Sequence, residues 1–169
     1  SAATFGIPVS DGIAPAPPLR NALSASDPHH WHPIPQVIAW LGDRLPADAR
    51  VLEIGPGSVP FARADVYVDF VDIPGLNGRP LVKCDVATER LPFEDKSFDF
   101  VVCRHMLEDM VNPFPVCAEM SRVAKAGYIE TPSPIAELCR GTDGASAAGT
   151  PWRGYHHHRF IVWEHAGEL

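Results

Sequence analysis

Short apolar segments recur along this chain at the spacing of buried strands. They are residues 50–54, 66–70, 81–84, 98–103 and 127–131. The segments 50–54 and 98–103 are almost continuously apolar or β-branched, as is typical of strands that are buried on both faces of a parallel sheet. The pattern therefore predicts five strands of a mostly parallel sheet.

Apolar residues recur at helical spacing in two segments, 34–45 and 113–125. The first stripe consists of Val37, Ile38, Leu41 and Leu45, and the second of Val116, Met120 and Val123. Pro46 ends the first helix, and Asn112 is expected to cap the second, with Pro113 as an early helical residue. Each stripe predicts a helix that packs one face against the sheet.

The remaining segments show little periodicity. Residues 1–32 contain several of the eighteen prolines and predict an irregular arm. Residues 132–154 are rich in Gly, Ser, Ala and Pro and predict a loop, with room for a short helix at 134–140. Residues 155–163 resemble a last strand. We therefore expect one domain over 33–169, which either has six strands or is truncated at the C-terminus.

Two of the connections between strands are unusually short. Residues 55–65 and 71–80 each contain prolines, and neither is long enough for a regular crossover helix. Strands that alternate with crossovers still predict an open α/β sheet. One face of that sheet needs another cover, which could be the helix at 34–45, the proline-rich arm or a partner subunit.

Composition narrows the range of functions. The chain has 169 residues, of which 46% are apolar and 21% charged, with a net charge of −7. This acidic balance argues against a nucleic-acid or membrane-surface partner. No apolar run approaches the ~18–20 residues of a membrane span, and no signal peptide is evident. The four cysteines form no C-x-x-C pair, so we expect free thiols and a cytoplasmic protein.

A glycine turn follows the first predicted strand. Gly55 and Gly57 flank Pro56, and glycine lets a ligand approach the bare backbone. A dinucleotide fingerprint needs a third glycine three residues later, where this chain has Pro60. The turn therefore lacks the anchor for a pyrophosphate. It suits a cofactor without phosphates, such as S-adenosylmethionine.

The segment "VLEIGPGS" resembles motif I of the class I S-adenosylmethionine-dependent methyltransferases. The segment "DVATERLPFEDKSFDFVVCRHMLEDM" is similar to the part that follows in the small-molecule, type 11-like branch of that family. The resemblance covers about residues 35–131. It implies a Rossmann-like open, mostly parallel sheet with reduced first and second crossover helices, and transfer of a methyl group to a small molecule. A non-catalytic cofactor-binding or scaffolding relative is the alternative.

The resemblance also implies roles for residues around the glycine turn. The turn from Gly55 through Pro56 to Gly57 would lie beneath the methionine and ribose parts of the cofactor. Glu53 matches the acid that organises the methionine ammonium. An acid at the end of the second strand would take the ribose hydroxyls, and Asp69 is favoured over Asp72 because it closes the apolar run.

Further roles follow from the resemblance at the third and fourth strands. Asp85 would accept from the adenine amino group, with the alternative that it forms an Asx turn. Val86 would offer a backbone N–H and an apolar wall. Cys103, Arg104 and His105 would face the methyl group and the sulfonium.

Six of the eight histidines form two clusters. These are His29, His30 and His32, and His156, His157 and His158. In an extended strand His156 and His158 would share one face, which makes them candidates for the substrate pocket and, like His105, for a general base. No carboxylate or cysteine stands at ligand spacing near either cluster, so we expect no metal site.

The acceptor is expected to be a small molecule. The fourth strand is not followed by the Asn-Pro-Pro-aromatic pattern of the family's nucleic-acid and glutamine branches, which the resemblance leads us to set aside. The sequence leaves the attacking atom and the oligomeric state open, and a homodimer is compatible with it.

Overall fold

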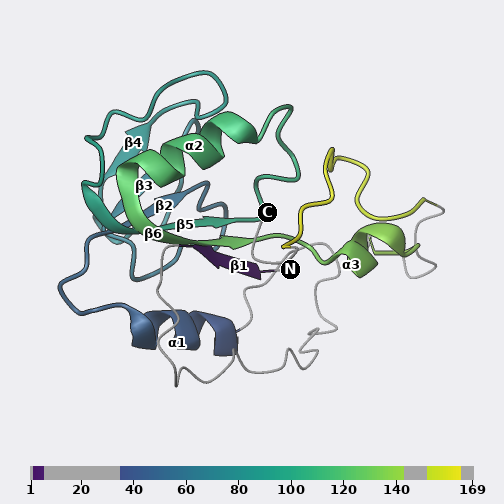
Figure 1. Cartoon of the computed structure of the whole chain (residues 1–169), viewed down its shortest axis with the longest axis horizontal. Helices are drawn as coiled ribbons and strands as arrows, with labels where there is room; N and C mark the ends of the chain where they lie inside the picture. Colours follow the sequence, from purple (N-terminus) through teal and green to yellow (C-terminus); the bar gives the residue numbers. More distant parts are fainter. Residues whose placement is uncertain (1, 6–34, 143–151, 165–169) are drawn as a thin grey trace.

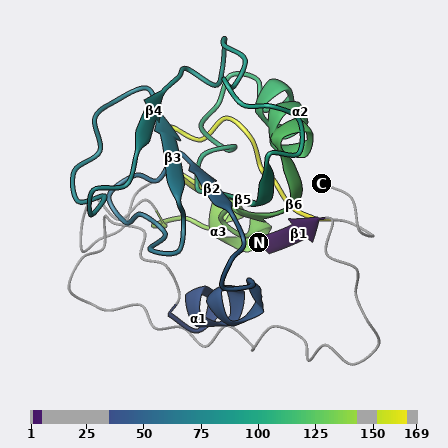
Figure 2. The same ribbon diagram turned by 90° about the vertical axis from the view of Figure 1, so that its left-hand side faces the viewer.

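A six-stranded sheet forms the centre of the computed structural model, which describes residues 2–5, 35–142 and 152–164. The strands are β1 (Ala2–Phe5), β2 (Val51–Ile54), β3 (Val66–Asp69), β4 (Leu81–Lys83), β5 (Phe98–Arg104) and β6 (Ala124–Glu130). Their order across the sheet is β1-β6-β5-β2-β3-β4, and Figure 2 shows them fanned out from β4 to β1. All neighbouring pairs from β6 to β4 are parallel, which confirms the predicted open α/β sheet.

The strand β1 was not predicted. Its four residues pair antiparallel with β6, from Ala2 opposite Glu130 to Phe5 opposite Gly127. The prediction of an irregular arm was therefore wrong for residues 2–5. An edge strand is held by backbone hydrogen bonds, which place little demand on the pattern of side chains. The rest of the proline-rich arm lies outside the described residues.

The helices α1 (Pro35–Arg44) and α2 (Phe114–Val123) lie on opposite faces of the sheet (Figure 1). Both helices were predicted. Asn112 was expected to cap the second helix, and its side chain does accept from the N–H of Phe114 at 3.2 Å. The helix itself starts one residue later than expected, after Pro113. The two helices bury different clusters. The cluster under α1 includes Val37, Leu41, Val51, Phe100, Val102 and Tyr128, and the cluster under α2 includes Leu52, Val101, Cys103, Val116, Met120 and Val123.

The two short crossovers contain no helix, as predicted. In the first, Phe61 and Ala64 are buried in the cluster under α1 and fill space that a helix would otherwise occupy. The guanidinium of Arg63 fastens this crossover by donating to three backbone carbonyls at 2.8–2.9 Å. The hydroxyl of Tyr67 also donates to the carbonyl of Phe61 at 2.9 Å. Side chains of the crossover and α1 therefore cover this face of the sheet together.

The predicted strand at 155–163 does not form. These residues follow the short helix α3 (Pro134–Leu138), which was predicted, and run as a loop beside it (yellow in Figure 1). The N–H groups of Arg159 and Phe160 donate to the carbonyl of Glu108 at 2.6 and 3.2 Å. At these two residues the backbone of the segment is thus bonded to the loop after β5 instead of to a strand.

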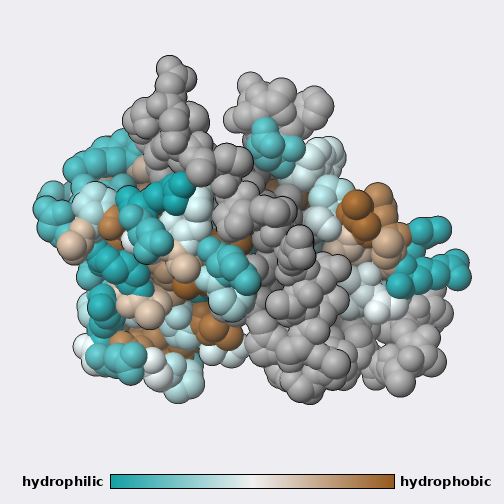
Figure 3. Space-filling view, turned by 90° about the horizontal axis from the view of Figure 1, so that it is seen from below, coloured by the Kyte–Doolittle hydropathy of each residue, from teal (hydrophilic) through white to brown (hydrophobic). Residues whose placement is uncertain are grey.

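The helix α3 buries a charged side chain and exposes apolar ones. Glu137 is buried, whereas Ile135 and Leu138 are exposed, and Figure 3 shows hydrophobic residues gathered at this end of the molecule. A buried carboxylate is costly unless it is paired. Its partner is His158, whose Nδ1 lies 2.7 Å from Oε1 of Glu137.

The helices in the described part of the chain are all too short or too polar to cross a bilayer.

Candidate functional site

The residues predicted to bind a cofactor meet at one edge of the sheet. Parallel strands end at a common edge, and ligands of open α/β sheets bind there. The pairing places Ile54 opposite both Val68 and Cys103, and Asp69 opposite Lys83. The loops after β2, β3, β4 and β5 therefore all leave the sheet at the same edge.

The glycine turn has the backbone that its sequence predicts. Gly55 and Gly57 adopt φ angles of 65° and 55°, a region that side chains disfavour. Gly55 also lies under Met106, because a Cβ built on it would be 2.7 Å from the Met106 sulfur. A Cβ on Gly57 would meet nothing within 4 Å. The turn thus packs tightly at Gly55 and presents open backbone at Gly57.

Glu53 and Arg104 form a buried ion pair beneath this turn. Arg104 donates to Oε1 of Glu53 through Nη2 at 2.6 Å and Nε at 3.1 Å, and the side chains are 2% and 0% exposed. The other Glu53 oxygen accepts from the N–H of Phe61 at 2.6 Å, and Arg104 also donates to the carbonyl of Val59 at 2.7 Å. The pair therefore fastens the loop after β2 to the end of β5.

The electrostatics of this pair are dominated by burial. Burial raises the pKa of Glu53 above its ordinary value, while the charge of Arg104 and the N–H of Phe61 act in the opposite direction. Glu53 was predicted to organise the methionine ammonium of the cofactor, and Arg104 to face its methyl group and sulfonium. In the structure Glu53 and Arg104 form an ion pair with each other. Any contact of either residue to a ligand would come in addition to that pair.

The two candidate ribose acids differ in their surroundings. Asp69 ends β3, and its Oδ1 accepts from the N–H of Val71 at 3.0 Å. Nothing in the described segments bonds to its Oδ2. Asp72 is 96% exposed at its side chain and pairs with Lys83 at 2.7 Å. The geometry therefore favours Asp69, which has an anchored carboxylate with one oxygen left for a ligand.

Asp85 forms the Asx turn that the sequence left as an alternative. Its Oδ1 accepts from the N–H of Ala87 and its Oδ2 from the hydroxyl of Thr88, both at 3.0 Å. Carboxylate oxygens have further lone pairs, so the turn does not prevent a contact to an adenine amino group. Val86 beside it is half-buried and packs against the core.

The side chains at the end of β5 differ in how deeply they are buried. Cys103 is fully buried in the cluster under α2, and burial raises its pKa well above the ordinary value, so it remains a neutral thiol. His105 follows with a φ of 48° and is 19% exposed at its side chain. Of the three residues expected to face the methyl group, His105 is therefore the least buried.

His105 lies between two carboxylates. Its Nδ1 is 3.4 Å from Oε1 of Glu108, and its Nε2 is 3.2 Å from Oε1 of Glu130. The hydroxyl of Tyr128 donates to the other Glu130 oxygen at 2.6 Å. Burial lowers the pKa of His105, but the two carboxylates outweigh it and the net pKa is raised. The pKa of Glu130 is lowered, because its bonds to His105 and Tyr128 outweigh its own burial.

The triplet of histidines forms a turn, and the predicted sharing of a face was wrong. The N–H of His158 donates to the carbonyl of Tyr155 at 3.2 Å, which closes the turn. His157 and His158 come together, with their Nε2 atoms 3.7 and 3.9 Å from Oδ1 of Asp109. His156 remains exposed. The pairing depends on the loop after β5, which no periodicity in the triplet could reveal.

Sequence reasoning missed four carboxylates of this region. They are Glu108, Asp109, Glu130 and Glu137. Glu130 could have been found, since it ends β6 and so stands at the ligand edge by the same argument as Asp69. The other three offer no local signal, because their partners come from distant parts of the chain.

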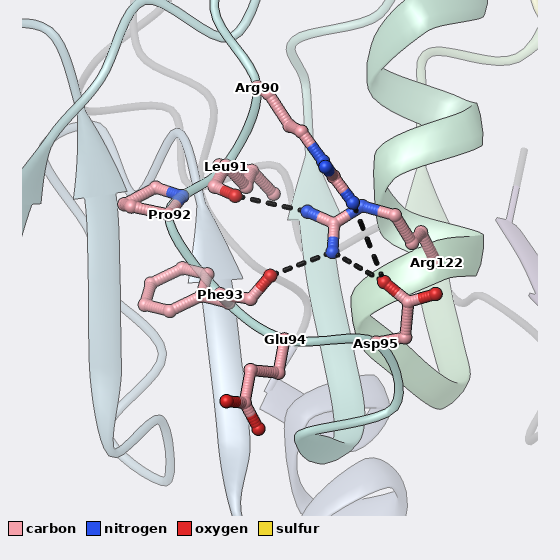
Figure 4. A pocket seen from close by; sticks show the side chains of 7 residues that line it. All are labelled: Arg90, Leu91, Pro92, Phe93, Glu94, Asp95 and Arg122. Carbon is pink, nitrogen blue, oxygen red and sulfur yellow. Dashed lines mark hydrogen bonds and ion pairs between the residues drawn. The ribbon is translucent and has the colours of Figure 1, made fainter.

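A surface hollow lies at the opposite end of the strands (Figure 4). Residues 90–95 and Arg122 line it. Arg122 is near the end of α2, and its guanidinium donates to the carbonyls of Leu91 and Phe93 at 3.0 and 2.7 Å and to Asp95 at 2.9 Å. These bonds hold the loop before β5 against α2. The hollow is therefore structural and contains none of the predicted site residues.

The buried ion pair makes a prediction about stability. Replacing Arg104 by Met should lower the free energy of unfolding by about 3–5 kcal/mol, because it leaves the buried Glu53 carboxylate without its cation. The double variant Glu53→Gln/Arg104→Met should recover part of this loss, since no charge remains and Phe61 keeps an acceptor. Urea denaturation of the three proteins measures both effects. A loss below about 1 kcal/mol in the single variant would contradict the role given to the pair.

The contacts of His105 with Glu108 and Glu130 lead us to predict that the stability of the protein depends on pH. A raised pKa means that protonated His105 stabilises the fold, fully below its ordinary value of 6.5 and less as the pH rises through the folded-state value. The stability advantage of the wild type over His105→Gln should therefore be larger at about pH 6 than at about pH 9. Chemical denaturation at both pH values measures it. His156→Gln, at an exposed position, is the control and should show no such change.

The chain is similar to several solved structures, of which two are named here. One is described as a possible histamine N-methyltransferase from Thermotoga maritima, with 23% identity and a TM-score of 0.43 over 52% of this chain and 44% of that one. The other is the YcgJ protein from Bacillus subtilis, with 20% identity and a TM-score of 0.43 over 52% and 45%. This chain thus spans less than half the length of either structure. No curated protein matched the sequence.

A family model gives the stronger result. The model described as "Methyltransferase domain" matches residues 36–129, which is more than half of the chain. The matched range includes β2 to β5 and the loops that follow them. This chain belongs to the methyltransferase domain family.

Proposed function

We propose that this protein transfers the methyl group of S-adenosylmethionine to a small molecule. The observation that carries the proposal is the extent of the family match. It covers 36–129, and every residue expected at the cofactor lies within it, from Glu53 to Arg104. The same residues converge on the carboxyl edge of the sheet, where ligands of such folds bind. The sequence match and the geometry therefore point to one place.

The residues present fit a cofactor without phosphates. Gly57 offers open backbone for the approach of a ligand, and the anchored carboxylate of Asp69 has an oxygen left to accept from a ribose hydroxyl. The turn after Gly57 contains no helix, so it has no helix N-terminus to receive a pyrophosphate. The donor set thus suits an adenosine joined to an amino acid better than a dinucleotide.

Bound S-adenosylmethionine supplies a methyl group that is already activated by the sulfonium charge. The protein's task is then to position the acceptor in line and to exclude water. His105 is the candidate base for an oxygen nucleophile, with Glu130 and Tyr128 fixing its ring. Its Nδ1 lies 3.4 Å from Oε1 of Glu108, so an acceptor's hydroxyl would have to replace that contact to be deprotonated. His158, paired with Glu137, is less available for this role.

A non-catalytic cofactor-binding protein is the second candidate. The observation that favours it is that several expected contacts are already occupied. Glu53 and Arg104 bond to each other, Cys103 is buried, and both nitrogens of His105 face carboxylates. A protein that only binds the cofactor would need the glycine turn and Asp69 but no base. Methyl transfer therefore has to be measured separately from binding.

The proposed cellular compartment of the protein is the cytoplasm. All four cysteines are unpaired thiols, as in a reducing compartment. The net charge of −7 disfavours nucleic acids and anionic membranes as partners. A small molecule is accordingly the proposed acceptor. Size measurement in solution would decide whether the protein is a homodimer.

Calorimetry with S-adenosylmethionine and its demethylated product tests the proposal. We expect both to bind at one site per chain. Transfer of a labelled methyl group to a panel of small amines, alcohols and thiols then separates the two candidates. Binding of neither compound by folded protein would contradict both of them. Binding without transfer to any acceptor, with a panel broad enough to include each type of attacking atom, would favour the non-catalytic one.

Asp69 and Asp72 provide a matched pair of variants. Asp69→Ala should weaken binding of the demethylated product by roughly 1–3 kcal/mol, the scale of losing a hydrogen bond to a charged group. Asp72→Ala removes the same groups from an exposed position paired with Lys83 and should leave the affinity unchanged. Calorimetry of both variants measures the difference. The reverse result would assign the ribose contact to Asp72.

A further inference from the structure

Three side chains with metal-ligating atoms meet where the histidine turn touches the loop after β5. Asp109, His157 and His158 each offer one such atom, and these atoms all lie within 4.8 Å of one another. The Nε2 atoms of His157 and His158 are 3.7 and 3.9 Å from Oδ1 of Asp109. Two imidazoles and one carboxylate form a donor set that zinc commonly takes in proteins.

A fourth residue orients one of these ligands. Oε1 of Glu137 lies 2.7 Å from Nδ1 of His158, and both side chains are less than 10% exposed. A hydrogen bond at Nδ1 leaves the lone pair of Nε2 on the side of Asp109. Ligating histidines usually have such a carboxylate at the other ring nitrogen, where it fixes the tautomer and raises the basicity of the ligand. The cluster thus contains a ligand that is already prepared to bind a cation.

The backbone holds the ligands independently of any ion. Asp109 lies in a turn closed by its N–H to the carbonyl of Met106 at 3.2 Å. The histidine turn is closed at His158, whose ring lies 4.5 Å from that of Tyr155. Gly154, just before it, has a φ of 59°, and a Cβ there would collide with the backbone of Glu137. The turn is therefore packed closely against α3, beside the imidazole of His158.

The charges of the surroundings favour a cation. Glu108, next to Asp109, is buried, and in the described part of the chain neither of its carboxylate oxygens accepts a hydrogen bond. His105 is its ion-pair contact, at 3.4 Å. Glu137 adds a second buried carboxylate beside His158.

We propose that Asp109, His157 and His158 bind a divalent transition-metal ion, with zinc as the best match. Tetrahedral zinc with bonds of ~2.0–2.1 Å places its ligand atoms about 3.4 Å apart. The separations of 3.7 and 3.9 Å between Asp109 and the two histidines therefore need only a small contraction, and the third pair of ligand atoms lies within 4.8 Å. His157 and Asp109 are 51% and 43% exposed at their side chains, which leaves a path for the ion and a fourth position for water. Magnesium and calcium prefer oxygen ligands and fit two imidazoles poorly.

The proposed ion would join two parts of the chain. Asp109 belongs to the loop after β5 and the histidines to the segment after α3. That segment also contacts the loop after β5 through Arg159 and Phe160. An ion there would hold residues 155–163 against the ligand edge of the sheet. The proposal concerns metal binding alone and does not depend on methyl transfer.

Zinc titration of chelator-treated protein, followed by calorimetry, tests the proposal. We expect one zinc per chain for the wild type. Asp109→Asn and His157→Ala should each weaken binding at least tenfold. His156→Ala removes a neighbouring, exposed imidazole of the same turn and should leave the affinity unchanged. Glu137→Gln should weaken binding by about 10–100-fold, as expected for a residue that acts through a ligand.

Cobalt substitution adds a spectroscopic measurement. Cobalt bound by the wild type should show the visible absorption of a four-coordinate site, and His157→Ala should lose it. His157 is half-exposed, so this variant is expected to fold even if Glu137→Gln does not, and circular dichroism verifies this. The proposal is overturned if the wild type binds less than one ion per chain. It is also overturned if His156→Ala weakens zinc binding as much as His157→Ala does.

Discussion

The ion pair between Glu53 and Arg104 is the interaction on which the ligand edge depends. It lies where the central strands β2 and β5 end, and it bonds the backbone of the glycine loop at both Val59 and Phe61. A pair this deeply buried gains little net stability over apolar residues of the same size. Its effect is on geometry. The loop after β2 is held at the end of β5, and Gly57 is left exposed beside it.

Side-chain contacts from loops also explain how the sheet stays covered although two of its crossovers lack a helix. The missing cover is replaced by side chains of short loops, with Phe61 in the core and Arg63 bonded to three carbonyls. Arg122 likewise donates to backbone carbonyls at the opposite end of the strands, where it bonds the loop before β5 to α2. A guanidinium can satisfy several backbone acceptors at once, which a loop without regular structure otherwise leaves unpaired. Arginine thus takes over part of the role that helical hydrogen bonds have in a longer crossover.

The fold could be predicted wherever the signal was local. Continuous apolar runs gave β2 and β5, helical spacing gave α1 and α2, and the prolines at 55–65 excluded a helix there. The failures all involve partners distant in the chain. The residues of β1 have no pattern of their own, and the histidine triplet forms a turn because the loop around Asp109 and α3 surround it. The candidate site follows the same rule. Its predicted acids all stand at strand ends that the apolar runs locate, whereas the pairing of Glu53 with Arg104 leaves no local signal in the sequence.

The histidine turn shows how far a local pattern can mislead. An alternating strand would have placed His156 and His158 on one face and separated them from His157. The turn instead joins the neighbours His157 and His158, and it does so around a carboxylate from another loop. Adjacent residues converge only when the backbone turns sharply between them, which an extended strand cannot do. The bond between Glu137 and His158 therefore has two consequences, because it fixes the position of the turn against α3 and the direction of the imidazole that faces Asp109.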